Sequence, residues 1–557
     1  MNKLLSAIVG IILLISIVYN FYNNSSSNIL GRDESLYIFL AKGHNSNTPL
    51  YAPPGSWLDA IEQGVKRTTD PPGFFLLLHF WEKVSFNEIW LRLLPLIFYL
   101  ISIVTLIKIA LLLRFSLLLS LCLGFLPLAS ERMVFHSLEI RAYGMEVCLT
   151  YLMIFFGLKI IVKINELRSP NLKDWIILTL VMVVGLSSRF SFVISSISIF
   201  TVLWLVIVFN KKQPFFKTNF ISLGISSILS LVFFAVYFRM KPYLGTNSAI
   251  DSVSNRFFDY TTPEGFINIF SFFIKQITLI PIALLGGSGI KDTYFYYIVI
   301  ILIVGFTYIG IASVYHCKKN INLLNLKTNL ILYLGLFLYP LIAIFLSGFL
   351  AISGIHPFSL DSRYSMYLQP SLHVFIMGCV LLISPQTGNH HQNKSCFVNK
   401  YHYLSFTLIP VFIVLIYGLH YLFYQWTFRM GGAQHTTQVI NKMIKDHELK
   451  EINYWYISLG EIESFKYHVL YGGLKGKLSS QAKIIFENRP VTVNEVTCSE
   501  LETIFNEAEV NNKIVMLLGH VNKKEAELYW KIFEQYFSNV KYGEFEISSE
   551  QIGIAIR

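Results

Sequence analysis

The sequence predicts a polytopic α-helical membrane protein that ends in a small α/β domain. Hydrophobic residues make up 54% of the 557 residues and only 14% are charged, whereas soluble domains carry roughly 25% charged residues. The mean hydropathy is +0.53, and several apolar runs exceed the roughly 20 residues that cross a bilayer. From residue 431 onward the chain is polar. We therefore expect a transmembrane domain over 1–430 and a soluble domain over 431–557.

Charge and cysteine content exclude several other classes of protein. The net charge of +11 comes from lysines and arginines that gather in short loops between apolar runs. This distribution is typical of cytoplasmic loops and does not indicate nucleic-acid binding. The six cysteines show neither metal-ligand spacing nor a framework of pairs, which excludes a disulfide-dense domain. We expect no metal ion and no cofactor.

The first apolar segment, 4–20, follows Lys3 and has no small-residue cleavage site before the polar residues 23–27. It is typical of a retained anchor rather than a cleaved signal peptide. The next segment, 22–89, is a long loop rich in proline, glycine and aromatic residues. Loops of this length in compact proteins are usually functional. We expect it to contain short helices that lie along the membrane surface.

The middle of the chain predicts six further spans, and basic loops orient them. The spans are 90–112, 115–130, 140–163, 174–188, 191–209 and 218–238. Lysine and arginine mark the loops near residues 159–173 and 211–217 as cytoplasmic. With the N-terminus inside, the loops 22–89, 131–139 and 239–265 lie outside.

The later spans require one assignment that hydropathy alone does not settle. Both 266–286 and 293–315 are long enough to cross, yet two crossings would place Lys318 and Lys319 outside, against the charge rule. We therefore interpret 266–286 as an interfacial or re-entrant helix. The remaining spans are 293–315, 329–352, 365–384 and 403–424. The total is about eleven crossings, with the C-terminus outside.

The polar residues 431–557 contain short β-like runs separated by helical patterns. The runs are Ile452 to Ser458, Ile484 to Phe486, Ile514 to Gly519 and Ile552 to Ile556. No glycine fingerprint for nucleotide binding is present. We expect an extracytoplasmic α/β domain that serves as a rigid cap or a substrate-docking domain, in preference to a second active site.

An acidic pair in the first outer loop is the leading candidate for chemistry. Asp33 and Glu34 follow the first apolar segment directly. By itself the pair is most simply a solvated surface feature. Other ionisable residues on the same predicted outer face favour a site instead, because charges at a span boundary either face water or serve function.

These accompanying residues come in three motifs. The first is Asp70, a double proline and, in the next span, Arg92, which could also snorkel to the interface. The second is Glu139, Arg141 and Tyr143, with Glu139 and Tyr143 four residues apart on one helical face. The third is Arg363 with Tyr364, a guanidinium fork beside a phenol. Weaker candidates are Lys83 and Arg189, the latter also explained as an interfacial anchor.

Carboxylates, arginines and an adjoining apolar body suit a polyprenyl-phosphate-linked sugar. In this ordered set of motifs the chain resembles the GT-C fold glycosyltransferases, in the branch of protein O-mannosyltransferases and lipid A aminoarabinose transferases. The resemblance covers roughly residues 1–425. It implies transfer of a sugar from a polyprenyl-phosphate donor to a hydroxyl acceptor on a glycolipid, glycan or protein. It also implies the outer face of a membrane, for which we expect the bacterial inner (plasma) membrane.

The resemblance also implies roles for individual residues. Asp33 matches the catalytic base of the family's first loop, with Glu34 as support. Arg141, Tyr143, Arg363 and Tyr364 are the expected donor-phosphate ligands, with Asp70, Lys83, Arg92, Glu139 and Arg189 as possible support. The chain departs from the family where Asp70 replaces a histidine or lysine, and where 187–190 lacks a histidine. These departures affect the donor sugar and any metal contact.

Two other functions fit a polytopic chain. A transporter or lipid flippase would also have many spans, but transporters often show internal repeats and broken helices near the midplane. The sequence shows no two-half symmetry, and its charges fall at predicted span boundaries. An inactive scaffold would keep the fold and lose the acid, whereas Asp33 and Glu34 are both present.

Overall fold

The computed structural model describes residues 2–26, 32–240 apart from 46 and 69, 323–352, 363–383 and parts of 452–556. The chain divides into two compact units. The helical unit comprises Met1–Asn24, Thr68–Phe74 and Arg92–Thr427, and the α/β unit comprises Ser25–Arg67, Phe75–Leu91 and Phe428–Arg557. Most of the expected loop 22–89 therefore groups with the C-terminal strands, whereas the sequence places it in the transmembrane domain.

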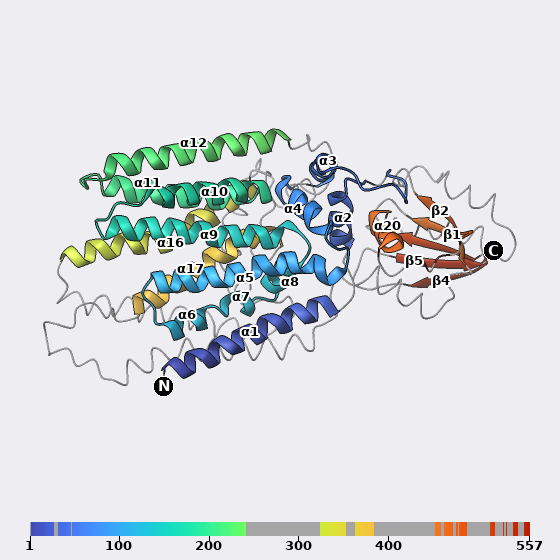
Figure 1. Cartoon of the computed structure of the whole chain (residues 1–557), viewed down its shortest axis with the longest axis horizontal. Coiled ribbons are helices and arrows are strands. Elements are labelled where there is room, and N and C mark those ends of the chain that lie inside the picture. Colours follow the sequence, from blue (N-terminus) through green and yellow to red (C-terminus); the bar gives the residue numbers. More distant parts are fainter. Residues whose placement is uncertain are drawn as a thin grey trace, which may run out of the picture. The chain divides into compact units, whose positions relative to one another are not determined.

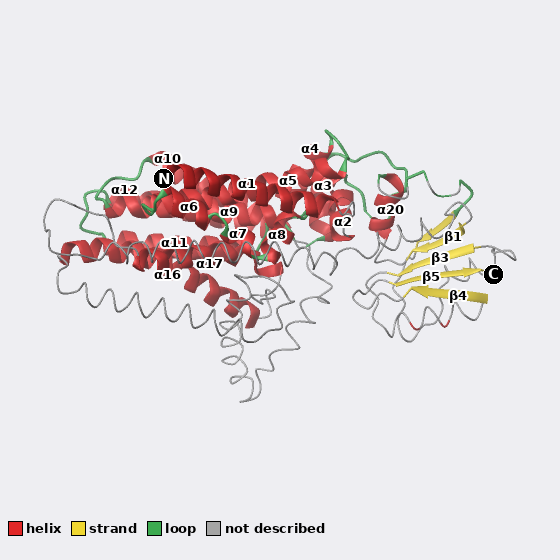
Figure 2. Cartoon of the chain, turned by 90° about the horizontal axis from the view of Figure 1, so that it is seen from below, coloured by secondary structure: helices red, strands yellow, loops and turns green. Residues whose placement is uncertain are grey.

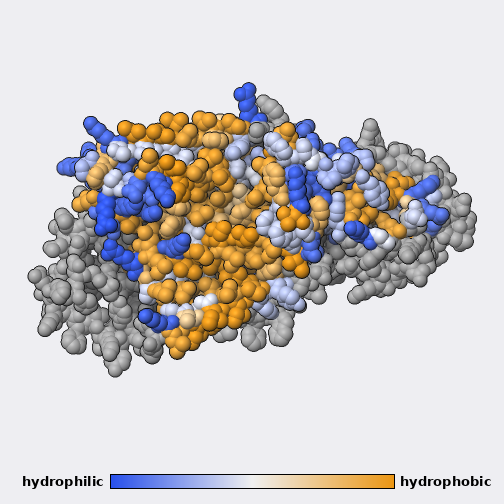
Figure 3. Space-filling model, viewed as in Figure 1, coloured by the Kyte–Doolittle hydropathy of each residue, from blue (hydrophilic) through white to orange (hydrophobic). Residues whose placement is uncertain are grey.

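Five described helices are long and apolar enough to cross a membrane, as in a multi-pass membrane protein. They are α1 (Asn2–Ser26), α5 (Glu88–Leu112), α9 (Ala142–Asn165), α11 (Phe192–Phe209) and α12 (Phe216–Met240). Beside them run α10 (Leu172–Ser188), α16 (Leu323–Ile352) and α17 (Gln369–Ile383) (Figure 1). Helix α9 contacts α10, α11 and α16. Hydrophobic side chains cover most of the described helical surface in Figure 3, which suits contact with lipid.

One expected span is replaced by shorter elements. Residues 115–130 form α6 (Leu117–Leu123) and α7 (Leu126–Ala129), which are separated by Gly124 and Phe125. Together they make an apolar stretch of only 117–128, too short to cross a bilayer as a helix. Residues 131–139, expected as a loop, form α8 (Glu131–Leu138), whose first turn is capped by the Ser130 hydroxyl. The expected segments 266–286, 293–315 and 403–424 lie outside the described residues.

Close helix contacts near Arg189 depend on two glycines. A Cβ on Gly144 would lie 2.5 Å from the Ser137 carbonyl oxygen, so α8 and α9 approach closely there. A Cβ on Gly185 would lie 2.2 Å from the Phe192 ring, so the end of α10 packs directly on the start of α11. Larger residues would separate these elements.

The α/β unit contains a five-stranded mixed sheet with the strand order β2-β1-β3-β5-β4. The strands are β1 (Ile452–Ile457), β2 (Lys483–Phe486), β3 (Lys513–Leu518), β4 (Ser538–Gly543) and β5 (Gln551–Ile556) (Figure 2). β1 pairs in parallel with β2 and β3, and β5 pairs antiparallel with β3 and β4. The four predicted β-like runs are confirmed, and β4 was missed because it lacks alternating apolar residues.

Helix α20 (Ile462–Leu470) covers part of the hydrophobic core beside this sheet. Its Phe465 ring lies 5.4 Å from the Trp455 ring of β1, and both residues are fully buried. The three short helices of the first loop belong to the described residues too: α2 (Arg32–Ala41), α3 (Trp57–Arg67) and α4 (Gly73–Glu82). The expectation of short helices in this loop is confirmed, and α2 contacts both α3 and α20.

Candidate active site

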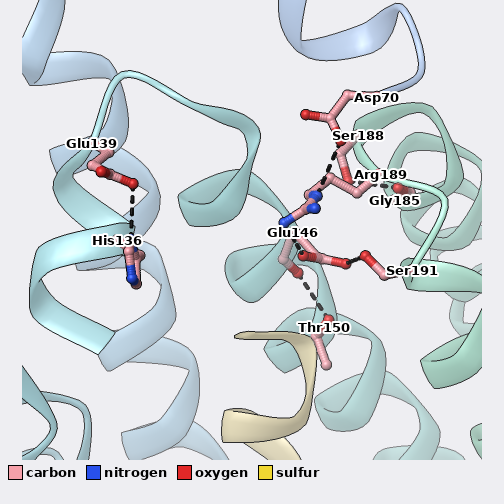
Figure 4. Close-up of polar contacts among 9 residues, drawn as sticks. All are labelled: Asp70, His136, Glu139, Glu146, Thr150, Gly185, Ser188, Arg189 and Ser191. Atoms are coloured by element: carbon pink, nitrogen blue, oxygen red, sulfur yellow. Dashed lines mark hydrogen bonds and ion pairs between the residues drawn. The ribbon is translucent and has the colours of Figure 1, made fainter. Parts of the chain in front are cut away.

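The helical unit buries a charged cluster centred on Arg189, in the turn between α10 and α11. Helix α10 ends at Ser188, and Arg189 is extended, with φ −152° and ψ 145°. This conformation turns its side chain inward, where it is 6% exposed. Its Nε donates to Asp70 Oδ1 at 3.2 Å and its Nη1 donates to Glu146 Oε2 at 3.5 Å (Figure 4). Arg189 is therefore a buried ion-pair partner, not an interfacial anchor.

Asp70 reaches this cluster because the segment 68–74 packs against the last turn of α10. Pro71 and Pro72 restrict the backbone after Asp70. A Cβ on Gly73 would lie 2.3 Å from Ser187 Oγ and 2.6 Å from the Ser187 carbonyl oxygen. Only glycine permits this approach without a shift, so the Pro-Pro-Gly sequence holds Asp70 beside Arg189.

Glu146 is the acid that the sequence analysis missed. It lies in the second turn of α9, is completely buried, and accepts a hydrogen bond from Ser191 Oγ at the start of α11. Thr150 Oγ1 donates to the Glu146 carbonyl oxygen one turn later (Figure 4). The signal was present: an acid inside an otherwise apolar segment is costly and marks a functional or paired position.

The Tyr143 ring contacts two arginines of this region. Its ring centroid is 4.1 Å from Arg189 Cζ and 4.8 Å from Arg141 Cζ, both within the range of cation–π attraction. The ring is 2% exposed. Arg141 is extended, with φ −144° and ψ 166°, and immediately precedes α9. The predicted motif of Arg141 and Tyr143 is thus joined in space to Arg189 and Asp70.

A second pair lies beside this cluster. His136 Nδ1 and Glu139 Oε2 are 2.9 Å apart (Figure 4). The His136 ring centroid is 5.6 Å from that of Tyr143. Glu139 is 8% exposed. Its extended backbone, with φ −67° and ψ 147°, ends α8 and directs the chain towards α9. Glu139 therefore lies at the rim of the cluster.

Three other predicted residues belong to the α/β unit. Asp33 and Glu34 form the first turn of α2 in the α/β unit, where acids complement the helix dipole. Asp33 is partly exposed and Glu34 is 5% exposed. Lys83, in the same unit, is exposed, with Nζ 5.2 Å from the Phe80 ring centroid.

Arg92 and the late motif complete the predicted set. Arg92 is 3% exposed in α5, so it is buried in the protein and does not snorkel to an interface. Arg363 and Tyr364 begin the 3₁₀ helix η1 (Arg363–Leu368), which contacts α9, but their side chains lie outside the described residues. In the same helix, the Tyr367 hydroxyl lies 2.7 Å from Ser347 Oγ of α16.

The cluster has the fixed cations that are needed to bind an anion. Two guanidinium groups are held on one phenol ring at the start of a membrane-spanning helix. Guanidinium groups bind phosphate oxygens with directional, charge-assisted hydrogen bonds. Among the residues that the structure describes, no group of three or more His, Cys, Asp and Glu side chains could hold a metal ion.

Comparison with solved structures finds proteins that are similar to this chain. A crystal structure of ArnT from Cupriavidus metallidurans bound to undecaprenyl phosphate is similar to this chain, with 10% sequence identity and a TM-score of 0.38. The alignment covers 98% of this chain and 97% of that chain. No family model matches the chain, and no curated protein matches its sequence.

Proposed function

We propose that this protein is a membrane glycosyltransferase that uses a polyprenyl-phosphate-linked sugar. It transfers the sugar to a hydroxyl group of a glycolipid, glycan or protein at the outer face of the plasma membrane. The observation that carries the proposal is the cluster of Arg141, Tyr143 and Arg189 at the start of α9. It offers cations for a phosphate next to helices apolar enough to lie in lipid, where a polyprenyl chain would lie.

The proposed reaction is a single inverting displacement. The acceptor hydroxyl oxygen forms a bond to the anomeric carbon while the bond from that carbon to the phosphate oxygen breaks. Asp33 takes the hydroxyl proton, a contribution typically worth about 10²- to 10⁴-fold in rate. Polyprenyl phosphate leaves with both bonding electrons, and its charge is stabilised by fixed cations. Glu34, beside Asp33 in the first turn of α2, orients that helix or the acceptor.

The two arginines of the cluster have unequal roles in this proposal. Arg189 already faces two carboxylates, Asp70 and Glu146, so much of its charge is compensated within the protein. This favours Arg189 as a residue that positions Tyr143. Arg141, which contacts the same ring, is a proposed phosphate ligand, together with Arg363 and Tyr364 from the sequence motif. Lys83 and Arg92 are supporting candidates.

The first test compares cells that carry the wild-type gene, no gene, or the Asp33→Asn variant. Mass spectrometry of envelope glycolipids, glycans and glycoproteins should find a sugar-bearing species only with the wild type. The variant should reach the membrane in normal amount. Glu62→Gln, an exposed acid of the neighbouring helix α3, is the matched control and should keep the species. Normal product with Asp33→Asn would eliminate Asp33 as the base.

A second test separates the enzyme from a transporter. Purified protein in liposomes is given extracted polyprenyl-phosphate sugars and envelope acceptors. A transferase releases free polyprenyl phosphate, whereas a flippase only changes the leaflet in which the intact donor lies. Arg141→Gln should reduce release of polyprenyl phosphate, because a leaving-group cation is lost. Movement of donor without release would overturn the proposed function.

A further inference from the structure

Helix α2, which carries Asp33 and Glu34, is held at its C-terminal end by contacts with α3 and α4. The backbone turns at Gly43, whose φ of +75° favours glycine, and Gly43 N donates to the Leu40 carbonyl at 2.8 Å. A Cβ on Gly43 would lie 2.6 Å from Asp59 Cβ, so this turn packs directly on the start of α3. From α4, His79 Nδ1 lies 2.8 Å from the Ala41 carbonyl oxygen, within hydrogen-bond distance.

Lys42, the residue after α2, is enclosed by aromatic rings. Its side chain is 1% exposed, and its Nζ lies 3.3 Å from the Phe86 ring centroid and 3.5 Å from the Tyr471 ring centroid. The two rings are 5.1 Å apart and stacked at 27°. Within the described residues, Lys42 Nζ has no hydrogen-bond partner. The ammonium group is therefore held by ring faces, as in cation–π recognition.

In the described part of the chain, an acid lies near Lys42. Glu82, 2% exposed at the end of α4, interacts electrostatically with it. Burial lowers the pKa of Lys42 to about 8 and raises the pKa of Glu82 to about 8. Lys83 acts on Glu82, and His44 interacts with both Lys42 and Lys466. A buried lysine without hydrogen bonds is uncommon.

The enclosure joins segments that are remote in the sequence. Phe86 follows α4, Tyr471 follows α20, and Lys42 follows α2. A second link lies close by: Lys466 Nζ of α20 donates to the Thr48 carbonyl oxygen at 2.6 Å. The C-terminal part of the chain is thus bound to the segment after α2 at two points, and α2 itself contacts α20.

We propose that Lys42 is a positioning residue through which α20 sets the place of α2, and with it Asp33 and Glu34. The C-terminal residues then serve the reaction by orienting its acids and not as a second active site. A ten-residue helix is too short to be stable alone, so its position depends on its contacts. Lys42 lies nine positions after Asp33, and the helix between them is a rigid span of about 13 Å. The catalytic part of this inference rests on the proposed function.

The test uses the full chain in lipid nanodiscs and compares two substitutions with their conservative counterparts. Tyr471→Leu removes a ring and Lys42→Met removes the charge, whereas Tyr471→Phe and Lys42→Arg keep them. Amide hydrogen exchange over 32–41 should rise at least about tenfold in the first two variants and change little in the others. Exchange in β1 and β3 should stay at the wild-type level. Unchanged exchange over 32–41 in both disruptive variants would overturn the proposal.

A replacement variant and a measurement of product complete the test. If Tyr471→Leu also loses protection in β1 and β3, Phe86→Leu replaces it, because Phe86 supplies the other ring from outside the sheet. The sugar-bearing envelope molecule that requires the gene should fall about 10- to 100-fold in amount with Lys42→Met, because a small displacement of a catalytic group lowers the rate by about that factor. Its amount should recover with Lys42→Arg. A full product level with Lys42→Met would overturn the catalytic role. Absence of any gene-dependent species in the wild type would refute the proposed function, and exchange would still decide how α2 is held.

Discussion

Each unit of this protein buries a basic side chain, and the two units compensate the charge in opposite ways. In the helical unit, Arg189 faces two carboxylates through directional hydrogen bonds. In the α/β unit, Lys42 faces two aromatic rings and one acid, and its ammonium group has no hydrogen bond among the described residues. Arginine stays charged and presents a planar fork of five donors, whereas a buried lysine shifts its pKa. The first arrangement is therefore tied by ion pairs, and the second depends on shape and pH.

The largest expected effect comes from breaking the ion pairs of the helical unit. Arg189→Met leaves Asp70 and Glu146 buried without the guanidinium between them. Removing one partner of a buried pair costs about 3–5 kcal/mol. Chemical denaturation in detergent micelles, followed by circular dichroism, should show a loss of this size. Arg189→Lys should restore part of it, because the charge returns without the fork. A loss below about 1 kcal/mol, as for an exposed pair, would contradict a tightly paired cluster.

The next effect tests how Asp70 is held beside Arg189. Gly73→Ala would place a methyl group 2.3 Å from Ser187 Oγ, so the segment 68–74 must move. Overpacking of this kind costs about 1–3 kcal/mol. Gly224→Ala in α12 is the matched control, because its Cβ would meet nothing within 4 Å. The same denaturation measurement should find Gly224→Ala neutral or stabilising. Equal stability of the two variants would refute close packing at Gly73.

A pH effect distinguishes the second arrangement from the first. The pKa of Glu82 is raised from 4.5 to about 8, chiefly by burial. Between these values the folded protein keeps a proton that the unfolded chain has lost, so stability falls as pH rises, by at most about 1.4 kcal/mol per pH unit. Glu82→Gln lacks this dependence. Its apparent melting temperature relative to wild type should therefore increase from pH 5 to pH 8.

Lys42 should show the opposite dependence of stability on pH. Its pKa is lowered from 10.5 to about 8 by burial, so above pH 8 the folded protein loses a proton that the unfolded chain retains. Stability then rises with pH towards 10.5, and Lys42→Met removes that rise. Glu82 and His44 interact with Lys42 electrostatically and remain in this variant. A flat difference between each variant and wild type across pH 5–10 would show that neither group is buried as described.

The smallest effect is expected at an exposed pair. Lys66 and Glu62 form an ion pair on the surface of α3, with side chains 60% and 52% exposed. Solvent screening leaves such pairs worth about 0–1 kcal/mol. Lys66→Met should therefore hardly change the free energy of unfolding. A loss comparable with that of Arg189→Met would show that the measurement does not separate buried from exposed pairs.

Hydropathy and periodicity predicted much of the architecture. The apolar segments over 90–112, 140–163, 191–209 and 218–238 correspond to long helices, and the polar C-terminal residues form a mixed sheet. The segment 115–130 was predicted wrongly, because average hydropathy does not register the break near Gly124 and Pro127. The grouping of the first loop with the C-terminal strands also escaped prediction, since no local pattern encodes it.

By itself, the sequence determined the class of protein and predicted several residues of the candidate site: Asp70, Arg141 and Tyr143 from motifs, and Arg189 as a weaker candidate. Only the tertiary structure decided that Asp70 and Arg189, 119 residues apart, form one pair. It also revealed Glu146 as their partner and Lys42 as the residue held by Phe86 and Tyr471. The physical reason is the separation along the chain over which each kind of interaction acts. Hydropathy, caps and turns act over a few neighbouring residues, whereas buried charges are compensated by whatever distant side chains the packing brings to them.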